Sequence, residues 1–186
     1  MTTPVPTIVV FGSSTLAPDS PECQIVRALG QRLAEAGARV VSGGYAGVMG
    51  AISEGAHGAG GSVVGVTLGT FTDRRPNPWL TDEILSPDLY SRLRSLTETP
   101  DAYVVASGNV GTLTELFLTW NLAMLRLVPR RPIVLLGAHW HDLLDHLRDT
   151  RLVPDHHLDL LTVTHGVDDT LTALAAVLSE SRQAPR

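Results

Sequence analysis

Lysine is absent from this chain of 186 residues, in which all 14 basic residues are arginine. Without a lysine amine no Schiff base can form, so pyridoxal-phosphate enzymes and class I aldolases are excluded. P-loop nucleotide-binding proteins are excluded as well, because their glycine-rich loop needs a lysine that reaches the phosphates.

Cysteine and long apolar runs are also scarce. The single cysteine, Cys23, allows no internal disulfide, so we expect a protein of the reducing cytoplasm. The polar residues 1–6 lack the basic region of a secretory signal, and no apolar run approaches the ~18 residues of a membrane-spanning helix. The formal net charge is −5, which argues against non-specific binding to nucleic acid or to a membrane surface.

Short aliphatic segments alternate with helical patterns along most of the chain. We predict strands over residues 8–11, 39–41, 63–67, 102–106, 133–136 and 161–164. We predict helices over residues 21–36, 48–59, 87–97, 113–127, 140–147 and 168–178. This alternation is typical of a parallel sheet covered on both faces. We therefore predict an α/β fold, with a single Rossmann-like, doubly wound domain over residues 1–186 and a core of about residues 8–178.

Two segments depart from the regular pattern. Residues 68–81 show no periodicity and contain two prolines and two arginines, so we predict a long loop that is functional or mobile. The helix over residues 113–127 is apolar nearly all round, so we predict that it is central and buried.

The strongest candidate for a binding site follows the fourth predicted strand. Its loop and helix start comprise Gly108, Asn109, Val110, Gly111 and Thr112. Glycines let the backbone approach a ligand, and a helix N-terminus offers free amides and about half a positive charge to a phosphate. The carboxylate of Glu115 would lie one turn into this helix. The alternative is a tight turn whose carboxylate only favours the helix dipole.

Two further loops follow the first and second predicted strands. Because the carboxyl ends of parallel strands lie at one edge of a sheet, where ligands bind, we expect these loops at the same edge as the first candidate. The second loop holds Gly43, Gly44 and Gly47, followed by Met49, without the spacing of a dinucleotide-binding fingerprint. These glycines serve either a ligand or the packing of helix on sheet. Ser13 in the first loop can bond a ligand, although serine is also an ordinary turn residue.

Arginine and histidine supply the remaining candidates. Arg92 lies on the helix before the fourth predicted strand and can reach the same edge of the sheet. For Arg74, Arg75 and Arg94 we favour the interpretation as solvated surface charges. The seven histidines show no zinc-ligand spacing, so we predict no metal.

Together these segments resemble the LOG ("lonely guy") family of cytokinin-activating nucleoside 5′-monophosphate phosphoribohydrolases, often labelled "possible lysine decarboxylase". The resemblance runs over about residues 8–150. It rests on Gly12-Ser13-Ser14, on the run from Gly43 to Met49 and on the run from Ser107 to Glu115, which is similar to the family signature Pro-Gly-Gly-x-Gly-Thr-x-x-Glu.

The resemblance implies hydrolysis of the N-glycosidic bond of AMP or a cytokinin-type nucleotide, with Arg92 and Glu115 as catalytic residues. It also implies a phosphorylated nucleotide as ligand, no cofactor and a homodimer. Three positions depart from the family pattern: Ser107 replaces proline, Asn109 replaces the second glycine and Leu93 replaces a lysine.

These departures keep a second interpretation open. A non-catalytic nucleotide-binding or molybdenum-cofactor carrier protein of the same fold would keep the cleft without hydrolysis, and Asn109 and Leu93 favour it. A partner-binding domain without any phosphorylated ligand is a third possibility.

Overall fold

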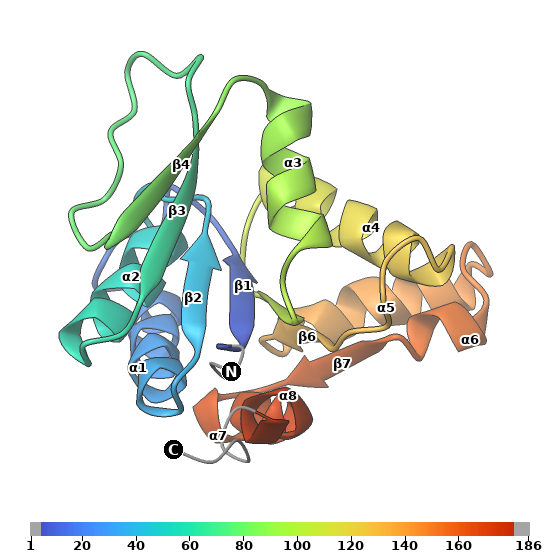
Figure 1. Ribbon diagram of the computed structural model, residues 1–186. Helices are drawn as coiled ribbons and strands as arrows, with labels where there is room; N and C mark the ends of the chain where they lie inside the picture. The colour runs from blue at the N-terminus through green and yellow to red at the C-terminus, as the bar shows by residue number, and fades with distance from the viewer. Residues whose placement is uncertain (1–4, 181–186) are drawn as a thin grey trace.

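A seven-stranded parallel sheet forms the centre of the protein in a computed structural model that describes residues 5–180 (Figure 1). The order of the strands is β4-β3-β2-β1-β5-β6-β7. Their bounds are β1 Thr7–Phe11, β2 Arg39–Ser42, β3 Val63–Leu68, β4 Asp82–Ser86, β5 Ala102–Val105, β6 Ile133–Leu136 and β7 Leu161–Thr164. Strands β2, β3 and β4 follow one another on one side of β1, and β5, β6 and β7 follow one another on its other side. The order therefore reverses between β1 and β5, which is where open α/β sheets bind ligands.

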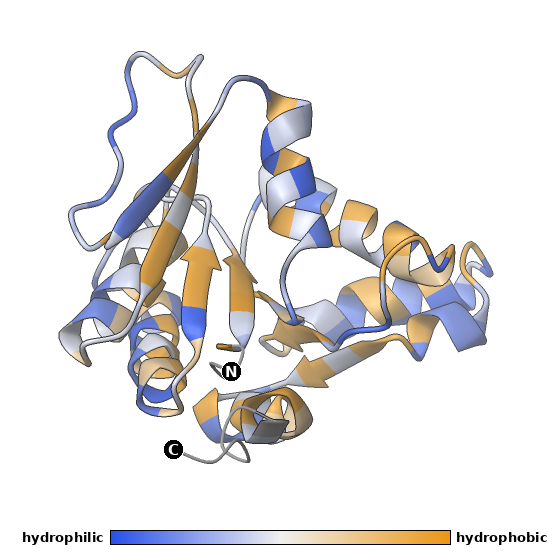
Figure 2. Ribbon diagram, in the orientation of Figure 1, coloured by the Kyte–Doolittle hydropathy of each residue, from blue (hydrophilic) through white to orange (hydrophobic). Residues whose placement is uncertain are grey.

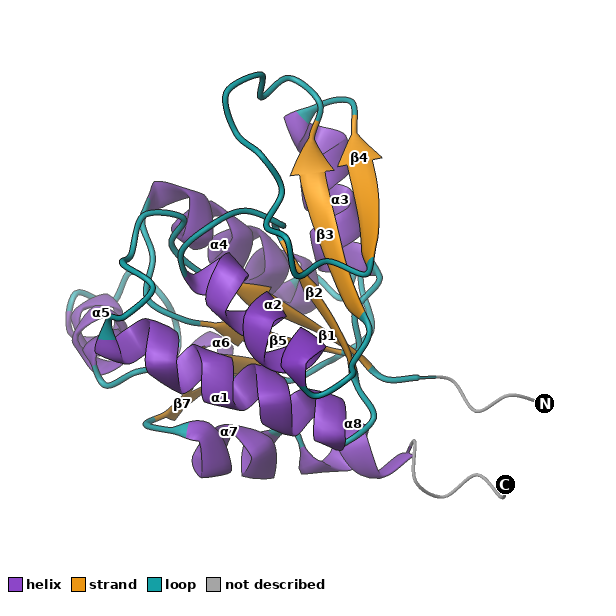
Figure 3. Ribbon diagram, turned by 90° about the vertical axis from the view of Figure 1, so that its left-hand side faces the viewer, coloured by secondary structure: helices purple, strands orange, loops and turns teal. Residues whose placement is uncertain are grey.

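Helices cover both faces of the sheet (Figure 3). The first face carries α1 Pro21–Glu35, α2 Val48–Gly58, α7 Val167–Ala173 and α8 Ala175–Glu180. The second face carries α3 Leu89–Glu98, α4 Val110–Met124, α5 His139–Asp149 and α6 Asp155–Leu158. This confirms the predicted α/β architecture with a doubly covered parallel sheet.

The core consists of two apolar layers separated by the sheet. Along β1, Ile8 and Val10 belong to the layer under α1 and α2, whereas Val9 and Phe11 belong to the layer under α4 and α5. Every one of these side chains is buried. Figure 2 shows the same apolar band through the central strands. A strand covered on both faces reads as a continuous apolar run, which is why β1 is visible in the sequence.

The edge strand β4 is missing from the sequence prediction. It pairs with β3 from Val64–Asp82 to Leu68–Ser86. Its two acidic residues, Asp82 and Glu83, and its two apolar residues, Ile84 and Leu85, are all exposed. No buried alternation marks such a strand, so its pairing depends on backbone hydrogen bonds that sequence patterns do not report. Strand β4 occupies residues between the predicted loop and the next predicted helix, so the predicted loop of residues 68–81 keeps nearly its full length, as residues 69–81.

Three helices also differ from their predictions. Helix α4 begins at Val110, so part of the predicted glycine-rich loop forms its first turn. The prediction that this helix is central and buried holds for one side only: Leu116 and Trp120 are buried, whereas Phe117 on the outer side is 40% exposed. The short helix α6 was not predicted, and the last predicted helix is divided at Leu174 into α7 and α8.

Among the described residues, no helix is both long enough and apolar enough to cross a membrane.

Candidate active site

Three loops meet at the carboxyl edge of the sheet, where the strand order reverses. The amide of Ser13, after β1, donates to the carbonyl of Ser107, after β5, at 2.9 Å. The carbonyl of Ser13 in turn accepts from the amide of Val48, at the start of α2, at 2.8 Å. These two bonds hold the loops after β1, β2 and β5 together. The three glycine- and serine-rich segments therefore form one continuous surface.

Two glycines in the loop after β2 are required by their backbone conformation, and Gly47 is also required by this close approach. Gly44 and Gly47 have φ angles of +79° and +64°, a region that side chains rarely adopt. A Cβ atom on Gly47 would lie 2.4 Å from the carbonyl oxygen of Ser13. Close packing of backbone on backbone thus explains Gly47 without a ligand. The hydroxyl of Ser13 is also engaged locally, since it accepts from the amide of Thr15 at 3.1 Å.

Arg92 extends from α3 across the ends of β2 and β3. Its Nε donates to the carbonyl of Val66 at 2.8 Å, and its Nη2 lies 3.5 Å from the carbonyl oxygen of Gly43. A Cβ atom on Gly43 would meet Nη2 at 2.1 Å and the sulfur of Met49 at 2.6 Å. Glycine at position 43 therefore makes room for the guanidinium and for Met49.

Glu115 completes this group from the second turn of α4. Its Oε1 lies 3.4 Å from Nη1 of Arg92, and each side chain is only 11% exposed. Burial raises the pKa of Glu115 to about 7, while the positive charge and hydrogen bond of Arg92 oppose this rise without cancelling it. The carboxyl group is therefore placed to exchange a proton near neutral pH, as a general base or acid requires.

The start of α4 is capped by its own sequence. Asn109 is the N-cap residue, and its Oδ1 accepts from the amide of Gly111 at 3.2 Å. Thr112 is buried beneath this turn, and a Cβ atom on Gly108 would lie 2.0 Å from its hydroxyl oxygen. Gly108 thus lets Thr112 pack inward. An anion that binds the Gly111 amide has to displace the Asn109 side chain.

The structure brings most of the predicted site residues to one edge of the sheet. It places Arg92 against Glu115 and Gly43, and Met49 beside Gly43. The carbonyl of Val66, which fixes Arg92, was missed because a backbone acceptor leaves no signal in the residue type.

The position after Arg92, where the family pattern has a lysine, contributes no charge to the candidate site. Leu93 is buried in the apolar packing of α3 rather than directed at a ligand. Arg94 lies on the surface, where it pairs with Glu98 at 3.6 Å, as the interpretation of a solvated charge predicts.

Histidines form ring contacts instead of a metal centre in the described part of the chain. His156 and His157 lie 4.2 Å apart between ring centroids, and His141 and His165 lie 5.4 Å apart. Within residues 5–180, no group of three or more histidine, cysteine, aspartate or glutamate side chains is arranged to hold a metal ion.

Comparison with known proteins identifies the family of this chain. Residues 49–174 match the model of a family described as "Possible lysine decarboxylase". The chain belongs to this family. It is the LOG family, and the absence of lysine shows that its older description cannot refer to Schiff-base chemistry in this member.

Two relatives within the LOG family share most of their length with the chain. A Mycobacterium marinum protein named cytokinin riboside 5′-monophosphate phosphoribohydrolase is 30% identical over 176 residues, which cover 91% of this chain and 93% of that protein. A Mycobacterium tuberculosis protein of the same name is 33% identical over 142 residues, which cover 73% of this chain and 75% of that protein.

Among solved structures, the molybdenum cofactor binding protein from Rippkaea orientalis superimposes with a TM-score of 0.75. The match covers 95% of this chain and 99% of that protein, at 21% sequence identity. At this identity the similarity establishes the shared fold alone.

Proposed function

We propose that the protein is a nucleoside 5′-monophosphate phosphoribohydrolase, which releases the free base and ribose 5-phosphate from AMP or a cytokinin-type nucleotide. The observation that carries this proposal is the buried pair of Arg92 and Glu115 beside the start of α4. The names of the two mycobacterial relatives support the same reaction.

The 5′-phosphate is assigned to the first turn of α4. The amides of Gly111 and Thr112 lie at a helix N-terminus, where the dipole favours an anion. Glu115 follows one turn later on the buried side of the same helix. A phosphate at the helix start therefore places the ribose close to this carboxyl group. Gly43, Gly44, Gly47 and Met49 form the neighbouring wall of the proposed nucleotide site.

The reaction adds water to the anomeric carbon as the bond from that carbon to the base breaks. Positive charge grows on the sugar ring as the base leaves, as in glycoside hydrolysis. The Glu115 carboxylate stabilises this charge and can accept the proton of the attacking water. The base departs with its bonding electron pair and takes up a proton. Arg92 remains charged throughout, so its role is to donate hydrogen bonds to the leaving base and to hold Glu115 in position.

A chromatographic assay of purified protein with AMP and isopentenyl-AMP tests this proposal. We expect release of adenine or isopentenyladenine together with ribose 5-phosphate. Nucleotide binding with no base released from either substrate would overturn the proposed hydrolysis.

A carrier or binding protein of the same fold is the second candidate. Two features favour it: the Asn109 side chain occupies the Gly111 amide, and Leu93 stands where the family pattern has a lysine. Both reduce the positive charge available to a phosphate. This alternative predicts a thermal shift with nucleotides or pterin phosphates and no base release.

We further propose that the protein is a cytoplasmic homodimer. Helix α4 and the segment after α5 line an apolar groove of about 660 Å³ that includes Phe117, Trp120, Met124 and Leu152. Phe117, Leu125 and Leu152 expose large apolar side chains on or beside α4. A second copy of this chain presenting the same surface would cover them, as in a two-fold symmetric interface.

A further inference from the structure

A pocket lies between three different loops at the carboxyl edge of the sheet, the edge at which Arg92 and Glu115 are also found. It has a volume of about 290 Å³ and is lined by Ser14 and Thr15 after β1, Tyr45 and Ala46 after β2, and Arg74 and Arg75 after β3. All three loops leave the carboxyl ends of neighbouring parallel strands. Nothing in the proposed hydrolysis uses this pocket.

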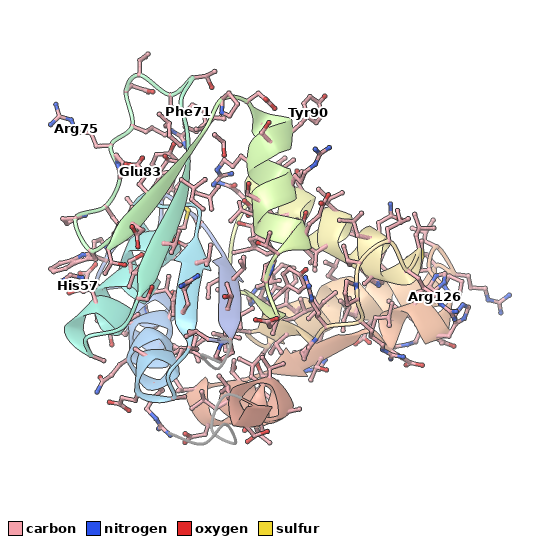
Figure 4. The ribbon with its side chains drawn as sticks, viewed as in Figure 1. His57, Phe71, Arg75, Glu83, Tyr90 and Arg126 are labelled. Atoms are coloured by element: carbon pink, nitrogen blue, oxygen red, sulfur yellow. The ribbon has the colours of Figure 1, made fainter. Side chains whose placement is uncertain are left out.

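The two arginines in this pocket bring unpaired positive charge. Within residues 5–180, neither Arg74 nor Arg75 forms an ion pair, whereas Arg27, Arg92 and Arg148 each contact a carboxylate. The guanidinium carbon of Arg74 lies 4.6 Å from the ring centre of Phe71. Figure 4 shows Arg75 extending outward from the loop, where it is accessible to a ligand arriving from solvent.

The segment that carries the arginine pair is fastened on both sides. Before it, the ring of Phe71 packs on that of Tyr45 with 5.8 Å between centroids. After it, the amide of Asn77 donates to the carbonyl of Gly44 at 2.8 Å, and its side-chain amide donates to the carbonyl of Tyr45 at 3.1 Å. The loop therefore holds both arginines next to the turn between β2 and α2. Both arginines are exposed to solvent, as the interpretation of solvated surface charges predicts, and the loop keeps these charges beside that turn.

The arginine pocket is close to the proposed nucleotide site. Tyr45 follows Gly43 by two residues, so their Cα atoms are at most ~7.6 Å apart. The carbonyl of Gly43 accepts from Arg92, and Ser14 directly follows Ser13, which is bonded to the loop before α4. A single ligand of nucleotide size can therefore contact both regions.

We infer that the arginine pocket binds a second anionic group, the additional phosphate of a nucleotide that carries two phosphate groups. Guanidinium groups form two-pronged hydrogen bonds with phosphate oxygens, and the hydroxyls of Ser14 and Thr15 can add further donors. This inference rests on the proposed function for the nucleotide, but the binding of phosphate by the arginine pair is independent of hydrolysis. The second phosphate can be joined to the first or attached at the 3′ position.

Calorimetric titration with AMP, ADP, adenosine 3′,5′-bisphosphate and inorganic pyrophosphate tests the inference. We expect the wild-type protein to bind ADP or the bisphosphate at least ~10-fold more tightly than AMP, because charge-assisted hydrogen bonds contribute on this scale. The double variant Arg74→Gln/Arg75→Gln should bind all three nucleotides with similar affinity. The matched control Arg94→Gln removes an exposed arginine from α3 and should keep the wild-type preference.

The outcomes separate this inference from the proposed function. Equal affinities of the wild-type protein for AMP and both doubly phosphorylated nucleotides would overturn the second phosphate site, even if AMP is hydrolysed. Persistence of the preference in the double variant would overturn it as well. If AMP is not hydrolysed, but the bisphosphate or pyrophosphate binds through the arginine pair, the inference stands and the proposed hydrolysis fails.

Discussion

Glu115 is an acidic residue whose surroundings disfavour its charge. Its pKa is raised to about 7 by burial, although Arg92 partly offsets that effect. The folded protein therefore keeps a proton on Glu115 at pH values where the unfolded chain has lost it. By linkage, the free energy of unfolding falls as the pH rises from about 4.5 toward and through 7.

This linkage predicts a difference between the wild-type protein and Glu115→Gln. The full loss for such a shift is about 3 kcal/mol, because each pKa unit corresponds to ~1.4 kcal/mol. Denaturant unfolding at pH 5 and pH 8 should show a larger loss of stability in the wild type than in Glu115→Gln. The half-exposed carboxylate variant Glu98→Gln should follow the wild type. Identical pH dependence in the wild type and Glu115→Gln would contradict the burial of an ionisable group here.

Asn109 is the second residue whose chemistry matters to the site. Because its Oδ1 occupies the Gly111 amide, we expect Asn109→Gly to free this donor and to bind AMP several-fold more tightly, with little change for unphosphorylated adenosine. Asn109→Asp should weaken AMP binding, because it places a negative charge beside the phosphate. Titration of both ligands measures the effect. Weaker AMP binding by Asn109→Gly would show that asparagine assists the phosphate instead of competing with it.

At the scale of helices, the packing of α1 on α2 depends on glycine. A Cβ atom on Gly55 of α2 would lie 1.9 Å from the carbonyl oxygen of Arg27 in α1. We expect Gly55→Ala to lower the free energy of unfolding by about 1–3 kcal/mol, the usual cost of overpacking.

The control for this prediction lies on the same helix. A Cβ atom on Gly58 has nothing within 4 Å, so Gly58→Ala should leave stability unchanged or raise it by up to ~1 kcal/mol, since alanine favours helix. Equal denaturation midpoints for the two variants would contradict the close contact between the helices.

The strands that the sequence predicts are those whose burial shapes their residue pattern. They include the edge strand β7, in which Leu161 and Thr164 are buried. Strands β1, β2, β3, β5 and β6 lie inside the sheet, and their continuous apolar runs identified them. Strand β4 forms an edge with exposed side chains, so no such run exists. Helix α4 misled the prediction for the opposite reason, because its outer side is apolar but exposed.

For the candidate site too, some features could be predicted from the sequence and others could not. Residue types, spacing and the resemblance to the LOG family predict Arg92, Glu115 and the glycine-rich loops as site residues, and the structure places Arg92 against Glu115. Their contacts could not be read from the sequence, because the carbonyls of Gly43 and Val66 that receive Arg92 are backbone groups. The capping bond of Asn109 depends on the exact start of α4, which lies three residues before its predicted start.

For the whole molecule, the exposed apolar side of α4 predicts self-association. Sedimentation at micromolar concentration should show a dimer for the wild type and a monomer for Phe117→Glu/Leu152→Glu, because both charges would be buried between two copies. Ile25→Glu is the control, since Ile25 is similarly exposed on α1, across the sheet. A monomeric wild type would contradict the proposed interface.

The central claim for the whole molecule is that the fold brings a nucleotide's anomeric carbon to Glu115. Base release by the wild type and Glu115→Gln, measured side by side with AMP binding, tests this claim most directly. We predict that Glu115→Gln folds and binds AMP but releases base at least ~10²-fold more slowly, the usual effect of removing one preorganised group. Unchanged base release by folded Glu115→Gln would contradict the claim.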